Sequence, residues 1–131
     1  MQINAIQSNR NNAQPAFTAV KLLSGAEEAL RRTLKTEEDV ALFNDIVEYR
    51  GFDKYADLYL FGNGKKLTAR IINKQDSTEG ILEQISQKFW QSTTSFLEKI
   101  NRKTADAESL LEKKAQTQKK FDDVIKKTDK I

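Results

Sequence analysis

Residues 55–72, YADLYLFGNGKKLTARII, decide the fold, because a turn signal stands between two stretches of alternating apolar residues. Asn63-Gly64 predicts a two-residue type I′ turn, since both residues tolerate the positive φ that this turn requires. The turn predicts a β-hairpin with one apolar face, on which Leu60 lies opposite Leu67. The remaining expected pairs are Gly62 with Lys65, Leu58 with Ala69 and Ala56 with Ile71, while Asp57 meets Arg70 on the other face.

A phosphate-binding loop is the alternative interpretation of the same glycines and lysines. A Walker-type loop continues from its lysine to Ser or Thr and then into a helix. Here Lys66 is followed by Leu67 and a β-branched run, and Leu67 also takes the place of the third glycine of a dinucleotide-binding motif. The hairpin is therefore the favoured interpretation.

Two short helices are expected before the hairpin. Ser24 with Glu27 three residues later is typical of a capped helix start, and this helix runs to about Leu34. Thr36 begins the second helix, and Gly51 suits the left-handed position that ends it. Residues 17–23, FTAVKLL, form either a further strand or the beginning of the first helix.

A long amphipathic helix is predicted from about residue 79, because no Gly or Pro follows Gly80. Trp90 and Leu97 form a second ridge beside its main stripe. A helix with so wide an apolar surface contacts two partners. The main stripe consists of Ile81, Leu82, Ile85, Phe89, Phe96 and Ile100.

Residues 104–131 leave two alternatives open. The apolar residues after residue 104 continue at the same helical angle as those before it, which favours one helix over about residues 79–128. Such a helix is roughly 75 Å long and needs a partner chain along its length. Lys99, Arg102 and Lys103 followed by Asp106 and Glu108 resemble the end of one helix and the start of another, which favours a break and an αα-hairpin. We favour the break.

The expected fold class is α+β, with a small antiparallel sheet packed against helices and a long C-terminal helix or αα-hairpin. Residues 1–15 form a flexible polar arm that ends at the only proline. Residues 16–103 form the α+β core. Residues 104–131 form a helix that folds back on the core or projects from it.

Composition excludes several kinds of chemistry. The 131 residues include no His and no Cys, which removes thiolate and imidazole catalysis and thiolate zinc sites. Glu37-Glu38-Asp39 and Asp122-Asp123 are consecutive on helices, so their carboxylates diverge and predict no metal site. We therefore expect no enzyme activity and no cofactor.

The expected function is a non-enzymatic protein-interaction module that binds itself or another protein through its C-terminal helices. The candidate contact residues are Trp90, Leu97, Leu111 and Phe121. The alternative is a nucleic-acid-binding protein that uses a lysine-rich helix flank and the outer hairpin face. Its candidate residues are Tyr59, Lys66, Arg70, Lys113, Lys119 and Lys120.

No stretch approaches the roughly 18 uninterrupted apolar residues of a membrane span, so no membrane association is expected. The first residues also lack the apolar region of a secretory signal. A cytoplasmic location is the expectation. Export by a route that needs no signal peptide is the alternative, because the polar start is rich in Asn, Gln and Ser.

Overall fold

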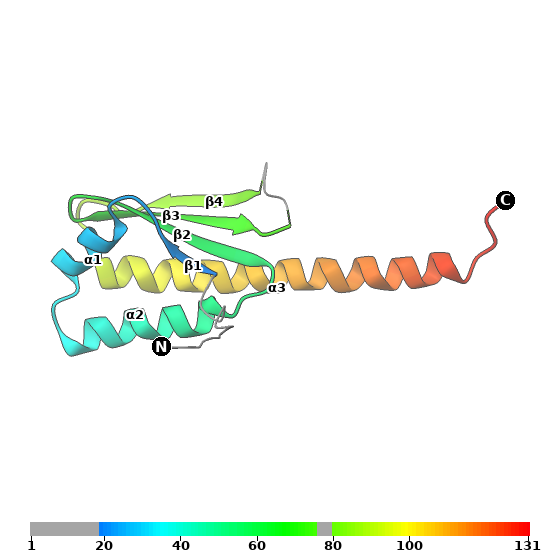
Figure 1. Cartoon of the computed structure of the whole chain (residues 1–131), viewed down its shortest axis with the longest axis horizontal. Coiled ribbons are helices and arrows are strands. Elements are labelled where there is room, and N and C mark those ends of the chain that lie inside the picture. Colours follow the sequence, from blue (N-terminus) through cyan, green and yellow to red (C-terminus); the bar gives the residue numbers. More distant parts are fainter. Residues whose placement is uncertain (1–18, 76–79) are drawn as a thin grey trace, which may run out of the picture.

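The computed structural model describes residues 19–75 and 80–131, and it confirms the α+β class. Four strands form one mixed sheet in the order β1-β2-β3-β4. Helix α3 packs against β2 and β3 of this sheet and also against α2, as Figure 1 shows. The elements are β1 (Val20–Leu22), α1 (Ala26–Thr33), α2 (Glu37–Gly51), β2 (Ala56–Asn63), β3 (Lys66–Asn73), β4 (Ile81–Ser86) and α3 (Thr93–Lys126).

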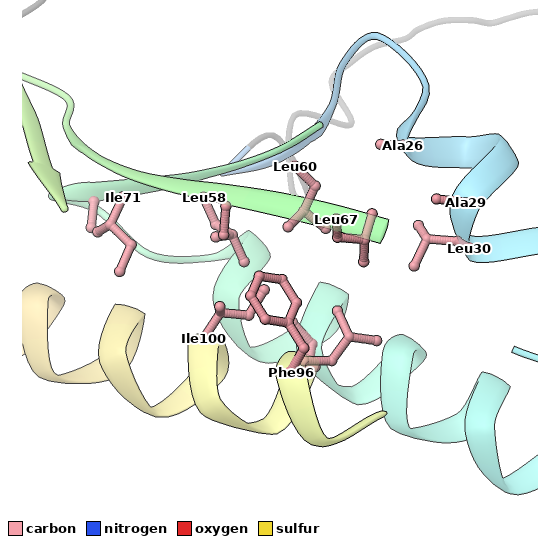
Figure 2. Close-up of a cluster of buried hydrophobic side chains, with 13 residues drawn as sticks. Ala26, Ala29, Leu30, Leu58, Leu60, Leu67, Ile71, Phe96 and Ile100 are labelled. Carbon is pink, nitrogen blue, oxygen red and sulfur yellow. The ribbon is translucent and has the colours of Figure 1, made fainter. Parts of the chain in front are cut away.

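The core lies between α3 and one face of the hairpin, as the alternating pattern predicts. Leu58 and Leu60 from β2 point toward Phe96 and Ile100 from α3, and all four side chains are fully buried (Figure 2). Burial of a large apolar side chain contributes roughly 2 kcal/mol, so these contacts dominate the stability. The other core residues are Ala26, Ala29, Leu30, Ile46, Ala56, Leu67, Ala69, Ile71 and Leu97.

The expected hairpin register is wrong by two residues. Leu58 lies opposite Ile71, and Asn63 lies opposite Lys66, so Gly64 and Lys65 form the turn, with Gly64 at φ 66°. A shift of two equals the side-chain period of a strand, so every residue keeps its face. The ladder contains eight residues on each strand.

The expected contact between Asp57 and Arg70 is wrong for the same reason. Asp57 lies opposite Ile72, and its carboxylate pairs with Lys21 at 3.2 Å and Lys74 at 3.5 Å. Arg70 lies opposite Tyr59 and donates to Gln84 Oε1 at 2.6 Å. Each charge therefore has a partner on a neighbouring strand or loop.

The strand expected within residues 17–23 is present as β1, although residues 17 and 18 and the expected arm 1–15 lie outside the described part. β1 pairs with β2 in parallel, with Val20 opposite Leu58. The sheet is therefore mixed and not purely antiparallel. Parallel pairing requires a crossover, and α1 and α2 provide it.

Helix ends were predicted with mixed success. Thr36 caps α2, where its hydroxyl accepts the Asp39 N–H at 3.1 Å, as expected. The cap of α1 is Gly25 at φ 78°, without a side-chain hydrogen bond, so the prediction of Ser24 is wrong. Gly51 is the last residue of α2, followed by Phe52 as the C-cap, so its expected left-handed role is also wrong.

The helix predicted from residue 79 to about 100 is wrong in its first part. Residues 76–79, where it was to start, lie outside the described part. Ile81–Ser86 form β4, which pairs antiparallel with β3. Helix α3 begins at Thr93, where the hydroxyl of Ser92 accepts the Ser95 N–H at 3.1 Å. The apolar residues Ile81 and Ile85 also fit a strand, and the edge of β3 provides a partner for it. A register shift in this ladder places Ile85 opposite Ala69 and Ile81 opposite Ile72, on different faces of the sheet.

The break predicted near residue 104 is wrong, because α3 continues for 34 residues. Two of the charged residues that suggested the break bind groups outside the helix. Lys103 pairs with Glu83 of β4 at 3.1 Å. Glu108 accepts backbone N–H groups at the start of β2. These side chains attach an unbroken helix to the sheet.

Candidate functional site

Helix α3 changes character along its length. Its first half is part of the core, with Phe96, Leu97, Ile100 and Thr104 fully buried. From Glu112 onward almost every residue is exposed. We call residues 112–126 the α3 arm, and Figure 1 shows it projecting beyond the end of the sheet and of α2. The arm is the part of the described chain that lacks a packing partner.

Glu108 determines where the arm leaves the core. One carboxylate oxygen accepts the N–H groups of Tyr55 and Ala56, and the other accepts the N–H of Lys54, each at 2.9 Å. These donors begin β2, where the ladder gives them no partner. A carboxylate that accepts several N–H groups makes strong, charge-assisted hydrogen bonds, so α3 is fixed to the sheet at this point.

A cluster of charges surrounds this attachment. Arg50 pairs with Asp53 at 3.3 Å, and both side chains are largely buried. Lys74 donates to the Asp53 carbonyl at 2.7 Å. Burial raises the pKa of Asp53 from 3.8 to about 6, against the opposing effect of Arg50, and Glu108 adds to the rise. Asp53 therefore exchanges its proton at a mildly acidic pH, next to the point where Glu108 holds α3.

A hollow of about 450 Å³ lies where the arm passes the sheet. Its arm side includes Leu111, Ala115 and Gln118, which continue the core-facing side of α3. The remaining lining residues are Tyr55, Asn73, Gln75, Lys114, Lys119 and Asp122. A second groove, of about 390 Å³, lies on the other side of α3 beneath Leu82 of β4, and it shares Leu111 and Lys114 with the hollow.

Large apolar side chains are exposed along the arm and at its base. The exposed fractions are 64% for Leu110, 58% for Phe121 and 55% for Val124. Single exposed apolar residues are ordinary, but these three accompany the half-buried Leu111, Ala115 and Ile125 on one helix. Together they form an amphipathic surface next to two concavities.

The four candidate contact residues lie in three different places. Leu111 and Phe121 belong to the arm and its base. Leu97 is fully buried in the core, seven residues from Trp90 but separated from it by the start of α3. Trp90 is 67% exposed in the loop between β4 and α3, at the end of the molecule opposite the arm.

The candidate nucleic-acid residues are also dispersed. Tyr59 and Arg70 lie on the outer face of the sheet, where Lys21 lies over the Tyr59 ring and Arg70 lies over the Phe61 ring. Lys66 is at the hairpin turn. Lys113, Lys119 and Lys120 are on the arm, at the far end of α3. The structure does not bring these six residues onto one surface.

The described residues, 19–75 and 80–131, contain no group of three or more acidic side chains that could hold a metal ion. In the same residues, no helix combines the length and the apolar character needed to span a bilayer. The arrangement that remains is a rigid core with a projecting amphipathic helix.

Sequence reasoning missed two elements of this arrangement. Glu108 was interpreted as part of a helix start, because nothing local shows that its carboxylate reaches β2. Phe89 was assigned to the buried stripe, but it is 86% exposed. The sequence QKFWQS, residues 87–92, contains one signal for it, because Ser92 is a suitable helix cap that places Phe89 before the helix.

Comparison with known proteins finds no matching family model, no matching curated protein and no matching solved structure.

Proposed function

We propose that this protein is a non-enzymatic interaction module that self-associates through the α3 arm. The observation that supports the proposal is the 34-residue helix α3, whose last four turns carry exposed apolar side chains and contact little else. In water such a helical segment is only marginally stable without packing. A second helix along the arm supplies that packing.

The favoured occupant is the arm of a second copy in the antiparallel direction. On a helix with 3.6 residues per turn, the residues 111, 115, 118, 122 and 125 lie within an arc of roughly 80°. When two arms cross at Gln118 of each chain, Leu111 lies opposite Ile125 and Ala115 lies opposite Phe121. The large Phe121 thus meets the small Ala115, and apolar contacts recur on both sides of the crossing.

Charge order also favours the antiparallel pair. The same crossing places Lys114 opposite Asp122, twice in each dimer. A parallel pair in register instead places Lys114 against Lys114 and Asp122 against Asp122. Like charges at such positions destabilise the pair. The end of the partner helix also reaches the hollow beside Leu111 and Ala115.

Sedimentation equilibrium of the full chain tests the proposal. We expect a monomer–dimer equilibrium that Phe121→Ala weakens, and circular dichroism should show an unchanged core because Phe121 lies outside it. A chain that stays monomeric at several hundred micromolar contradicts self-association.

Charge exchange tests the direction of the pair. Lys114→Glu and Asp122→Lys should each weaken the dimer about tenfold, since each creates two repulsive contacts of the order of 0.5 kcal/mol or more. The double variant, or a mixture of the two single variants, should restore it. Lys120→Glu is the matched control, because residue 120 lies roughly 180° from Leu111 on the helix. An equal effect of the control, or no restoration, contradicts the antiparallel arrangement.

A further inference from the structure

The loop between β4 and α3, residues 87–92, displays two adjacent aromatic side chains. Phe89 is 86% exposed and Trp90 is 67% exposed, the highest values among the described aromatic residues apart from Tyr49. The arm proposed for self-association lies at the other end of α3 (Figure 1). These aromatics therefore need an explanation of their own.

Hydrogen bonds hold the loop in place. The buried Gln87 accepts the Leu67 N–H at 3.0 Å through Oε1 and donates to the Gln91 carbonyl at 2.8 Å through Nε2. Lys66 donates to the carbonyls of Phe89 at 2.8 Å and Lys88 at 3.3 Å. A loop that is already ordered loses little conformational freedom on binding, so Phe89 and Trp90 are presented in a prepared position.

A polar, cationic hollow of about 420 Å³ adjoins this loop. Its cations are Arg32, Lys65 and Lys66, and Arg32 also pairs with Glu28 at 3.9 Å. The one carboxylate in the lining, Asp39, accepts the Lys35 and Thr36 backbone N–H groups in the cap of α2. No lining residue is apolar: the others are Thr33, Gln87, Gln91, Ser92, Thr93 and Thr94.

The lysines around the loop lack acidic partners. Within the part of the chain that the structure describes, Lys65, Lys66 and Lys88 form no ion pair with a carboxylate. Lys88 Nζ instead lies over the Trp90 ring, 5.0 Å from its centroid. Positive charge and aromatic surface are thus concentrated together, and both are open to a ligand.

We infer that this loop and hollow bind single-stranded nucleic acid, with bases stacked on Trp90 and Phe89 and phosphates held by Arg32 and Lys65. Sequence-independent binding of single strands combines aromatic platforms with a positive groove that follows the backbone. The cores of protein–protein interfaces are depleted in charged residues. A hollow with three cations and no apolar lining therefore fits a phosphate backbone better than a protein surface.

The test is a fluorescence titration of the full chain with a single-stranded oligothymidylate. Trp90 is the only tryptophan, so its emission reports directly on the loop. We expect saturable quenching as bases stack. With about two neutralised phosphates, affinity should fall roughly sevenfold between 50 and 200 mM salt.

Variants identify the site. Lys65→Glu should weaken binding at least fivefold, and its side chain makes no hydrogen bond within the described residues, so the fold should be unchanged. Lys120→Glu, on the arm, makes the same charge change and should leave binding within twofold. With a labelled oligonucleotide and anisotropy detection, Trp90→Ala should weaken binding about tenfold and Trp90→Phe much less.

Three outcomes overturn the inference. The first is no saturable binding of the oligonucleotide at 20 mM salt. The second is equal weakening by Lys65→Glu and Lys120→Glu, which indicates nonspecific charge attraction or the arm lysines. The third is a blue shift of Trp90 emission with phosphatidylserine vesicles and no response to the oligonucleotide, which assigns the loop to a lipid surface. None of these outcomes bears on dimerisation of the arm.

Discussion

The carboxylate of Glu108 accepts the backbone N–H of Tyr55 at 2.9 Å, which joins the middle of α3 to the start of β2 across 53 positions of sequence. Two neighbouring N–H groups bond to the same carboxylate. Almost every residue of the helix from Glu112 onward is exposed, whereas one side of the helix before Glu108 is buried. This attachment is therefore the boundary between core and arm.

Replacing Glu108 should destabilise the core, because three backbone donors lose their acceptor. We expect Glu108→Ala to lower the free energy of unfolding by about 2–4 kcal/mol, and Glu108→Gln by roughly half as much, since the amide keeps one acceptor. Urea titration followed by circular dichroism measures both. Glu112→Gln, one turn later on the arm, is the control and should change stability by less than about 0.5 kcal/mol.

The raised pKa of Asp53 predicts a pH dependence of stability. Folding raises this pKa from 3.8 to about 6. The folded chain thus holds the proton more tightly than the unfolded chain, so the contribution of Asp53 to stability falls as the pH rises from 4 to 6. Asp53→Asn removes this fall, and its stability relative to the original chain should rise by about 1–3 kcal/mol between pH 4 and pH 7.

Urea unfolding at four pH values across that range provides the measurement. Asp45→Asn, an exposed position on α2, serves as the control and should keep the pH profile of the original chain. A constant difference between Asp53→Asn and the original chain at all pH values contradicts the assignment of the raised pKa to Asp53.

The two glycines that meet beside the hairpin should be far more sensitive than the glycine of the turn. A Cβ on Gly62 would collide with the backbone carbonyl of Gly25, whereas one on Gly64 meets open space. We expect Gly62→Ala to cost about 2 kcal/mol or more. Gly64→Ala should cost about 1 kcal/mol, from its φ of 66° alone. Thermal and urea unfolding give the comparison, and equal losses would contradict the close approach.

Trp90 and Leu97, paired by spacing in the sequence, should lose very different amounts of stability on truncation. Leu97→Ala should destabilise the protein by about 2–5 kcal/mol, because the side chain is fully buried. Trp90→Ala removes a largely exposed side chain and its contact with Lys88, and should cost about 1 kcal/mol or less. A large loss for Trp90→Ala in the same unfolding assay would indicate that the indole packs against the core.

The hairpin could be predicted because its single apolar face follows from alternation alone. The register could not, since a shift of two residues leaves Leu58, Leu60, Leu67 and Ala69 on the same face. Only the position of the turn distinguishes the two registers. Turn propensity favoured Asn63-Gly64, but the register with Gly64 and Lys65 in the turn is the one formed.

The region after Gly80 was harder to predict for a different reason. Ile81 and Ile85 are four residues apart, a spacing that a helix face and a strand face both allow. Pairing with β3 decides for the strand, and that pairing is not local in sequence. The continuity of α3 was hard to predict for a similar reason. The partners of Lys103 and Glu108 lie on β4 and at the start of β2, which are distant in sequence.

The candidate site could be predicted only in part. Leu111 and Phe121 were identified from helical spacing, and both lie on or beside the arm. The aromatic loop was not identified, because Phe89 fits a buried stripe until the helix start is placed at Ser92. Exposure of an aromatic residue depends on where an element begins, which propensity determines least well.

An unsupported helix that grows out of a folded core has a gradient of local stability. The core supplies the nucleus, so the arm adds helical turns without a new nucleation step, yet each turn nearer residue 126 unravels more easily. Amide hydrogen exchange should therefore slow steadily from the tip back toward Leu111. A chain that binds the arm would contact a segment that is already helical. The residues whose amide exchange slows on binding would show how far the bound partner extends along the arm.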